Sequence, residues 1–217
     1  ATLLPARARG LILVDAPLAF GVHGGPLATT VRRLPHARYI RWLAGSPVPG
    51  SVINAMSAAA VPDVFHGQRI IDLITSLGDP TAFVIHAAVE RWSCDEFPLP
   101  GQLFEDLLEQ LYREDRFLSG RLVIGQRRTG IARLTRPVMA VINPVGRVVP
   151  PASILAGLAA APGCSVSVLE YRAARGPVLQ HLGPLVTPFA HTHLWPKILD
   201  WVDRSGPWAR GLDGHSS

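Results

Sequence analysis

The sequence predicts an α/β protein with a parallel sheet, because three strand-length apolar runs occur in it and a helix-length segment joins two of them. The runs cover residues 10–18, 136–144 and 164–171. Each is apolar on consecutive residues instead of alternate ones, which is typical of strands covered on both faces of a parallel sheet. The chain has 217 residues, of which 48% are hydrophobic and 17% charged, and this composition supports a globular domain.

Two helices are expected around the second and third strands. Residues 151–163 have proline near the start and glycine at the end, so they predict a helix that crosses over between two parallel strands. After the third strand, residues 193–204 predict another helix, which Pro196 opens and Gly206 ends. Its apolar face would consist of Ile198, Leu199 and Val202.

The first and second strands are separated by too long an interval for a simple crossover. Glycine and proline break residues 21–120 into helical pieces, the clearest of which is GQLFEDLLEQLYRED at residues 101–115. We therefore expect a mostly helical cap inserted after the first strand. In its clearest helix, one apolar stripe is expected to face the core: Leu103, Leu107, Leu108 and Leu111.

This pattern divides the chain into three parts. Residues 1–20 and 121–205 are expected to form the α/β core, residues 21–120 the cap, and residues 206–217 a flexible tail. Three strands make a poor domain, because the first strand would leave an apolar edge unpaired. We therefore expect this chain to supply the later half of a doubly wound fold, with the front half outside it.

Composition and motif spacing exclude several classes of protein. The formal net charge is +5, but the basic residues are scattered arginines without a basic run, so a nucleic-acid partner is not expected. Cys94 and Cys164 have no metal-ligand spacing and predict neither a disulfide framework nor a metal site. No apolar run is long enough for a transmembrane segment, and Asp15 and Pro17 interrupt any signal-peptide core. We expect a cytoplasmic protein without a cofactor.

Candidate site residues follow the three strands. In open α/β sheets, sites form outside the carboxyl ends of the strands. Asp15 follows the first strand, the loop NPVGRVVPP follows the second, and a loop running to His181 follows the third. The α/β-hydrolase fold places its catalytic residues in the order nucleophile, acid and histidine along the chain. In that fold, the three strands predicted here would be the sixth to the eighth. Gly183 would allow a close approach beside the histidine.

The residue types suit acyl transfer. A serine or cysteine nucleophile must lose its proton near neutral pH, and imidazole is the base that titrates closest to that pH. A carboxylate on the other ring nitrogen fixes the tautomer and stabilises the imidazolium. The topology is equally compatible with a capping or surface role for His181, so both interpretations stay open at this point.

Four segments resemble the polyhydroxyalkanoate synthase family and its α/β-hydrolase relatives. They are GSPVPGSVINAM, residues 89–125, IARLTRPVMAVINPVGRVVPPAS and LQHLG. The resemblance covers the later half of the family over residues 10–203. It implies a cysteine nucleophile in a Gly-x-Cys-x-Gly turn, an aspartate and a histidine. It also implies that hydroxyacyl-coenzyme A thioesters are polymerised through covalent acyl-enzyme intermediates.

The chain departs from this family at two points. It contains no Gly-x-Ser-x-Gly or Gly-x-Cys-x-Gly motif, so we expect the nucleophile upstream of Ala1. In the loop before VVPP, where the family has aspartate, this chain has Gly146 followed by Arg147. Asp15, at the end of the neighbouring strand, is the topologically sensible substitute. An aspartate before Ala-Pro is also a common turn former, which is its alternative role.

The sequence therefore predicts acyl transfer on hydroxyacyl thioesters or esters by an upstream nucleophile, His181 and Asp15, and this chain alone is expected to be inert. Expected partners are a hydroxyacyl-coenzyme A or ester substrate, a second copy of the chain, or a separate front half. One alternative is an esterase, thioesterase or dehalogenase. Another is a non-catalytic relative that binds a partner or a polymer granule, for which Gly146 is the motivating residue.

Overall fold

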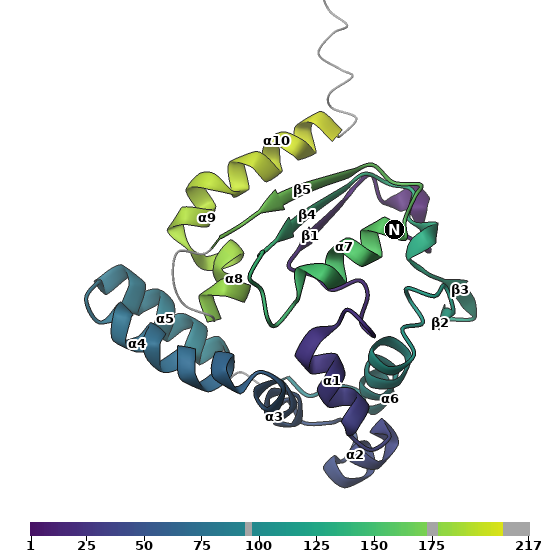
Figure 1. The fold of residues 1–217 in the computed structure, drawn as a ribbon, viewed down its shortest axis with the longest axis horizontal. Helices are drawn as coiled ribbons and strands as arrows, with labels where there is room; N and C mark the ends of the chain where they lie inside the picture. Colours follow the sequence, from purple (N-terminus) through teal and green to yellow (C-terminus); the bar gives the residue numbers. More distant parts are fainter. Residues whose placement is uncertain (94–96, 173–177, 206–217) are drawn as a thin grey trace, which may run out of the picture.

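The computed structural model describes residues 1–93, 97–172 and 178–205, so the tail expected at 206–217 lies outside the described residues. The protein is built around a parallel sheet of β1 (Leu11–Val14), β4 (Val138–Ile142) and β5 (Val166–Glu170), in the order β1-β4-β5 (Figure 1). The register pairs Leu11 with Val138 and Val138 with Val166. The three predicted strands and their parallel arrangement are confirmed.

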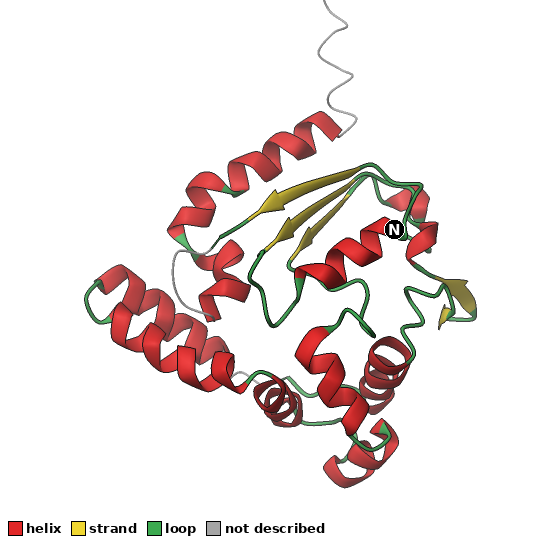
Figure 2. Ribbon diagram, in the orientation of Figure 1, coloured by secondary structure: helices red, strands yellow, loops and turns green. Residues whose placement is uncertain are grey.

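Helices lie on both faces of this sheet, as Figure 2 shows. The crossover helix α7 (Pro151–Ala159) packs on one face, and α9 (Pro188–His193) and α10 (Trp195–Ser205) pack on the other. Both predicted helices are therefore present, but the apolar face predicted for α10 is correct only at Ile198, because Leu199 is 57% exposed and Val202 is 37% exposed. One buried cluster joins α7 to β1 and β4, and a second joins α9 and α10 to β4 and β5. An α/β architecture with a parallel sheet is thus established.

Burial on both faces was predicted for all three strands, and the structure restricts it to β4. Every residue of β4 is buried. In contrast, Ile12 of β1 is 38% exposed, and Val166 and Val168 of β5 are 41% and 43% exposed. The reason is that each cluster of packed helices draws mainly on β4 and one neighbouring strand, so part of each outer strand is left uncovered.

The interval between β1 and β4 is mostly helical, and we call residues 21–120 the helical segment. It lies on the side of the sheet where the strands end (Figure 1). Its elements are α1 (Gly25–Arg33), α2 (Ala37–Ala44), α3 (Gly50–Ala60), η2 (Asp63–Gln68), α4 (Arg69–Ser76), α5 (Pro80–Ser93), α6 (Gly101–Glu105) and η3 (Asp106–Arg113). The division of the chain into core and cap stays a prediction.

Short elements complete the chain on either side. They are η1 (Pro5–Arg7), β2 (Leu122–Ile124), β3 (Arg127–Thr129), η4 (Ile131–Arg133) and α8 (Val178–Val186). β2 and β3 pair with each other as an antiparallel hairpin apart from the main sheet. The element that bears on function is α8, because it follows β5 and contains the predicted histidine.

The apolar stripe predicted in residues 101–115 is wrong at its first position. Leu103 is 46% exposed, whereas Phe104 and Leu108 are buried. These two residues are four apart and share one face, so Leu103 is turned outward. The segment also changes from α6 to the π-helical turn η3 at Asp106, and the wider π repeat does not align leucines spaced for an α-helix.

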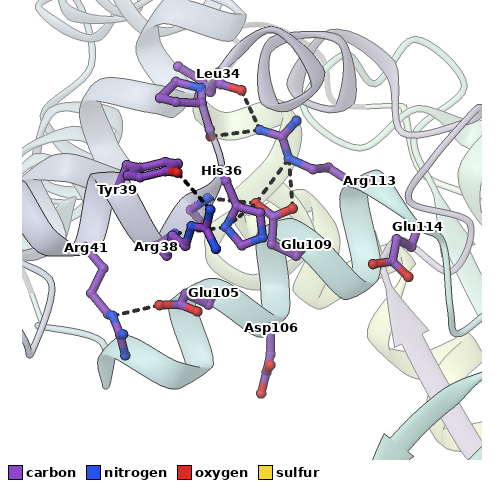
Figure 3. A network of polar contacts seen from close by, with 12 residues as sticks. Leu34, His36, Arg38, Tyr39, Arg41, Glu105, Asp106, Glu109, Arg113 and Glu114 are labelled. Atoms are coloured by element: carbon purple, nitrogen blue, oxygen red, sulfur yellow. Dashed lines mark hydrogen bonds and ion pairs between the residues drawn. The ribbon is translucent and has the colours of Figure 1, made fainter.

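A carboxylate from η3 holds the start of α2 (Figure 3). Glu109 accepts a hydrogen bond of 2.7 Å from the backbone N–H of Ala37 and pairs with Arg113 at 3.1 Å. Arg113 in turn donates to the carbonyl oxygens of Leu34 and Pro35, at 2.6 and 2.9 Å. The backbone N–H and carbonyl groups that have no backbone partner in the turn before α2 therefore form hydrogen bonds with side chains of η3.

The loop that follows β1 is anchored on η3 and on α7. Asp115, just after η3, accepts hydrogen bonds from the backbone N–H groups of Phe20 and Gly21, at 3.1 and 2.8 Å. On the other side, the Ser153 hydroxyl donates to the Ala19 carbonyl at 2.6 Å, and the Ala19 N–H donates to the Ser153 carbonyl at 3.0 Å. The course of the chain away from the sheet is thereby fixed.

An aromatic contact supports the same loop. The ring of Phe20 meets that of Tyr112 edge-on, with centroids 5.4 Å apart. Burial raises the pKa of Tyr112 above its ordinary value of 10.0. The phenol therefore stays neutral at physiological pH and serves as an apolar support for the loop.

We expect Asp115→Ala to lower the free energy of unfolding by about 2–3 kcal/mol, because two backbone donors lose a charged acceptor. Asp115→Asn should cost less, since the amide keeps one acceptor oxygen and asparagine tolerates the φ of +47° at this position. Urea denaturation measures both. Glu114→Ala is the matched control, because it removes the same charge from an exposed neighbour whose carboxylate pairs with Arg116. Equal losses for the Asp115 and Glu114 variants would contradict the anchoring role.

Candidate active site

Three polar or aromatic residues are buried side by side where the strands of the sheet end. Asp15 follows β1, Asn143 follows β4 and Tyr171 follows β5, with exposed fractions of 4%, 2% and 3%. The backbone N–H of Asp15 donates to the Val141 carbonyl at 3.0 Å, and that of Tyr171 donates to the Ile142 carbonyl at 2.9 Å. The sheet hydrogen bonding thus continues into these residues and fixes their backbones next to β4.

Asp15 has two unusual properties. Its φ is +48°, in the left-handed region that few residues other than glycine adopt. Its side chain is buried at the carboxyl end of the sheet, whereas a simple turn-forming aspartate would be solvated. A buried carboxylate on a strained backbone, at the edge where α/β proteins form their sites, is a candidate functional group.

The loop after β4 closes tightly around Gly146. The N–H of Val145 donates to the Asn143 side chain at 3.1 Å, and the N–H of Gly146 donates to the Asn143 carbonyl at 2.9 Å. A Cβ atom on Gly146 would lie 2.8 Å from the Val149 carbonyl oxygen and 3.1 Å from that of Asn143. Position 146 therefore has no room for a side chain in this conformation.

The residue after this glycine points to a different part of the protein. Arg147 forms an ion pair with Asp63 of η2, in the helical segment. Both side chains are about half exposed, so the pair contributes little to stability. Its geometry nonetheless directs the Arg147 guanidinium toward the helical segment.

His181 lies within α8, whereas the sequence predicted it on a loop ahead of a helix. The difference arises because residues 178–182 contain no helix breaker, and Pro184 stands near the end of a short helix where its missing N–H removes one hydrogen bond. The side chain of His181 lies outside the described part of the structure.

Contacts made by neighbouring residues hold α8 against the end of the sheet. The close approach expected at Gly183 is present, since a Cβ atom there would lie 3.1 Å from the Tyr171 hydroxyl oxygen. The carbonyl of Pro184 accepts a hydrogen bond of 2.9 Å from the Trp195 indole N–H. Sequence reasoning missed Tyr171, although its place at the end of the third predicted strand is visible in the sequence.

The described residues contain neither a metal-binding cluster nor a membrane-spanning helix. Across residues 1–93, 97–172 and 178–205, no group of three or more histidine, cysteine, aspartate or glutamate side chains could hold a metal ion. Within the same ranges, no helix has the length and hydropathy needed to cross a membrane.

Comparison with known proteins finds similarity along nearly the whole chain. A poly(3-hydroxyalkanoate) polymerase subunit PhaC from Allochromatium vinosum is 23% identical over 203 residues, which cover 93% of this chain and 54% of that protein. The PhaC subunit of Haloferax mediterranei is 22% identical over 201 residues, covering 93% and 40%. That of Synechocystis is 23% identical over 214 residues, covering 93% and 53%.

The chain thus spans about half the length of the curated relatives it matches. No family model and no solved structure matched it.

We expect Gly146→Asp and Gly146→Ala to destabilise the protein by similar amounts, about 1–3 kcal/mol, because both add a Cβ atom against fixed backbone oxygens. Thermal and urea unfolding of the two variants measure this. Gly78→Ala is the control for loss of glycine freedom, since nothing lies within 4 Å of a Cβ atom there and its φ, like that of Gly146, is not positive. Wild-type stability of Gly146→Asp would show that the loop readily accepts a carboxylate.

Proposed function

We propose that the chain forms the later part of an acyl-transfer enzyme of the polyhydroxyalkanoate synthase kind, because it is similar over about 93% of its length to a C-terminal portion of PhaC relatives. The substrates would be hydroxyacyl thioesters or esters, as the name poly(3-hydroxyalkanoate) polymerase implies for the relatives. In this proposal β1, β4 and β5 are the sixth to eighth strands of an α/β-hydrolase fold. The observation that carries it is the burial of Asp15 at the carboxyl end of the sheet.

The proposed chemistry uses an upstream serine or cysteine as nucleophile, His181 as base and Asp15 as the acid that orients it. His181 takes the proton of the nucleophile, which attacks the acyl carbonyl. Collapse of the tetrahedral intermediate expels the thiol or alcohol, which receives that proton from His181. The hydroxyl of a second hydroxyacyl unit then loses its proton to His181 and attacks the acyl-enzyme, forming the new ester and releasing the nucleophile.

The structure supports Asp15 over the family position for two reasons. At position 146 a Cβ atom would meet the Val149 carbonyl, so a carboxylate has no place in the observed loop. Asp15 is bonded through its backbone to Val141, next to the strand from which that loop emerges. The ends of neighbouring strands reach the same space beyond the sheet, so an acid after either strand can serve one histidine.

A binding role is a second candidate, and a specific observation favours it. The outer surface of α4 and α5 exposes apolar side chains, whereas Asp72 and Ser76 of α4 are buried. An exposed apolar surface of this kind marks an interaction site in soluble proteins. The residues concerned are Ile70, Ile71, Leu73, Ile74, Leu77, Phe83 and Val84, each more than 40% exposed. Function that survives His181→Ala would favour this candidate over catalysis.

The coding sequence upstream of Ala1 tests where the nucleophile lies. We expect a Gly-x-Cys-x-Gly or Gly-x-Ser-x-Gly motif within about a dozen residues, because the nucleophile turn opens the helix that leads to the next strand. Cysteine there favours the synthase, serine an esterase or thioesterase, and aspartate a dehalogenase. A start codon immediately before Ala1 would overturn the single-chain triad and favour a separate subunit or the binding role.

We expect Asp15→Asn to reduce turnover on the order of 10⁴-fold in the full-length protein, because an amide cannot hold the imidazole in the productive tautomer or stabilise its cation. Release of coenzyme A from 3-hydroxybutyryl-coenzyme A, followed with a thiol reagent, measures the rate. Circular dichroism should show that the variant folds.

Asp200→Asn is the matched control, because Asp200 is an exposed aspartate of α10, and its activity should equal that of the wild type. Activity of Asp15→Asn within twofold or so of the wild type would refute the role of Asp15, since loss of the acid in such a triad is severe.

A further inference from the structure

Tyr171 is held rigidly at the edge of the sheet where the strands end. Tyr171 is 3% exposed, and its backbone N–H is bonded to the carbonyl of Ile142 at the end of β4. Its side chain belongs to the buried cluster between the sheet and α9 and α10. The ring is therefore held by the sheet and the core together, and its hydroxyl has little freedom to move.

That hydroxyl begins a chain of hydrogen bonds that ends on α8. The oxygen atoms of Tyr171 and Thr187 are 2.7 Å apart, and the Thr187 hydroxyl donates to the Gly183 carbonyl at 2.8 Å. A threonine hydroxyl has one proton, so in this arrangement Tyr171 is the donor to Thr187. The hydrogen bonds therefore run from the Tyr171 hydroxyl to Thr187 and from the Thr187 hydroxyl to the Gly183 carbonyl.

Thr187 has no hydrogen-bonding capacity left over. Its oxygen also accepts from the N–H of Ala190 at 3.2 Å, which caps the N-terminus of α9. One donated and two accepted hydrogen bonds use the full capacity of a hydroxyl group. Thr187 thus links three elements: the end of β5, the last turns of α8 and the first turn of α9.

Gly183 sets how close α8 lies to this support. A Cβ atom at that position would be 3.1 Å from the Tyr171 hydroxyl oxygen and 3.2 Å from a carbon of its ring. Only a residue without a side chain lets the helix backbone approach the ring so closely. The ring fixes the distance of α8 from the sheet, and the hydrogen bonds through Thr187 fix its rotation and its position along the sheet edge.

His181 lies two residues before Gly183 in the same helix. We propose that Tyr171, acting through Thr187, is a positioning residue that holds the His181 backbone at the place the acyl-transfer reaction requires. This inference rests on the proposed function, because it concerns the same histidine. Misplacing a reacting group by about 1 Å costs on the order of 10²-fold in rate, so a modest shift of α8 is measurable.

The test uses Tyr171→Phe, which keeps the ring and removes the hydroxyl. In the full-length protein with 3-hydroxybutyryl-coenzyme A, we expect kcat to fall about 10- to 100-fold while KM changes less than about twofold, since the substrate contacts are untouched. Thr187→Val should lower kcat by a similar factor, and Thr187→Ser, which keeps the hydroxyl, should have the kcat of the wild type. Tyr39→Phe, at a tyrosine that is 50% exposed, should leave kcat unchanged.

A second measurement does not depend on catalysis. In the full-length protein, amide hydrogen exchange in α8 should become about tenfold faster in Tyr171→Phe, with exchange in β4 unchanged, because local opening of the helix becomes easier. Faster exchange with an unchanged kcat would overturn the positioning role, and unchanged exchange would overturn the anchoring itself.

The two readouts separate this inference from the proposed function. If Asp15→Asn stays active while Tyr171→Phe speeds exchange in α8 and lowers kcat, Asp15 is not the acid, and the positioning role of Tyr171 stands. If Asp15→Asn is inactive and Tyr171→Phe is not impaired, the triad stands and only the role of Tyr171 is overturned.

Discussion

The hydrogen bonding of β4 is the interaction on which the rest of the structure depends. This strand pairs with β1 on one side and β5 on the other, and all five of its residues are buried. The carbonyl groups at its end extend that pairing to Asp15 and Tyr171. One strand therefore positions both residues. The spacing between Asp15, the proposed acid, and Tyr171, which contacts α8, is set by the geometry of a parallel sheet.

The connections leaving the sheet hold the unusual backbone of Asp15 in place. After Asp15 the chain is bonded to Ser153 of α7 and then to Asp115 beside η3. A left-handed aspartate costs free energy, and such a conformation persists when the surrounding contacts leave the chain no alternative. These anchors come from segments more than ninety residues away along the chain. The geometry at Asp15 is therefore a property of the whole domain.

The arrangement of the sheet could be predicted from the sequence because contiguous apolar runs and a crossover helix are local patterns. The exposure of Ile12 and Val168 could not, since it depends on which helix covers which strand. Leu103 was misplaced because periodicity assumes a regular α-helix, and η3 is a π-helical turn.

The candidate site was predictable only in part. The place of Asp15 at a strand end and the close packing at Gly183 could be expected because strand ends and glycines are visible in the sequence, and the catalytic role of Asp15 stays a prediction. Tyr171 was missed because its role arises from a contact with Thr187, sixteen residues later, that no spacing rule describes. Asp115 was missed for the same reason, as its partners Phe20 and Gly21 are distant in the chain.

The tight turn at Gly146 has a consequence for how such a site can change over time. Loss of a side chain at this position lets the loop close onto its own carbonyl groups, and the closed loop then excludes the side chain. A side chain added there would work against the contacts of Asn143 that hold the loop closed. Moving an acid from the end of β1 to this loop would therefore require further substitutions in the loop as well as the new carboxylate.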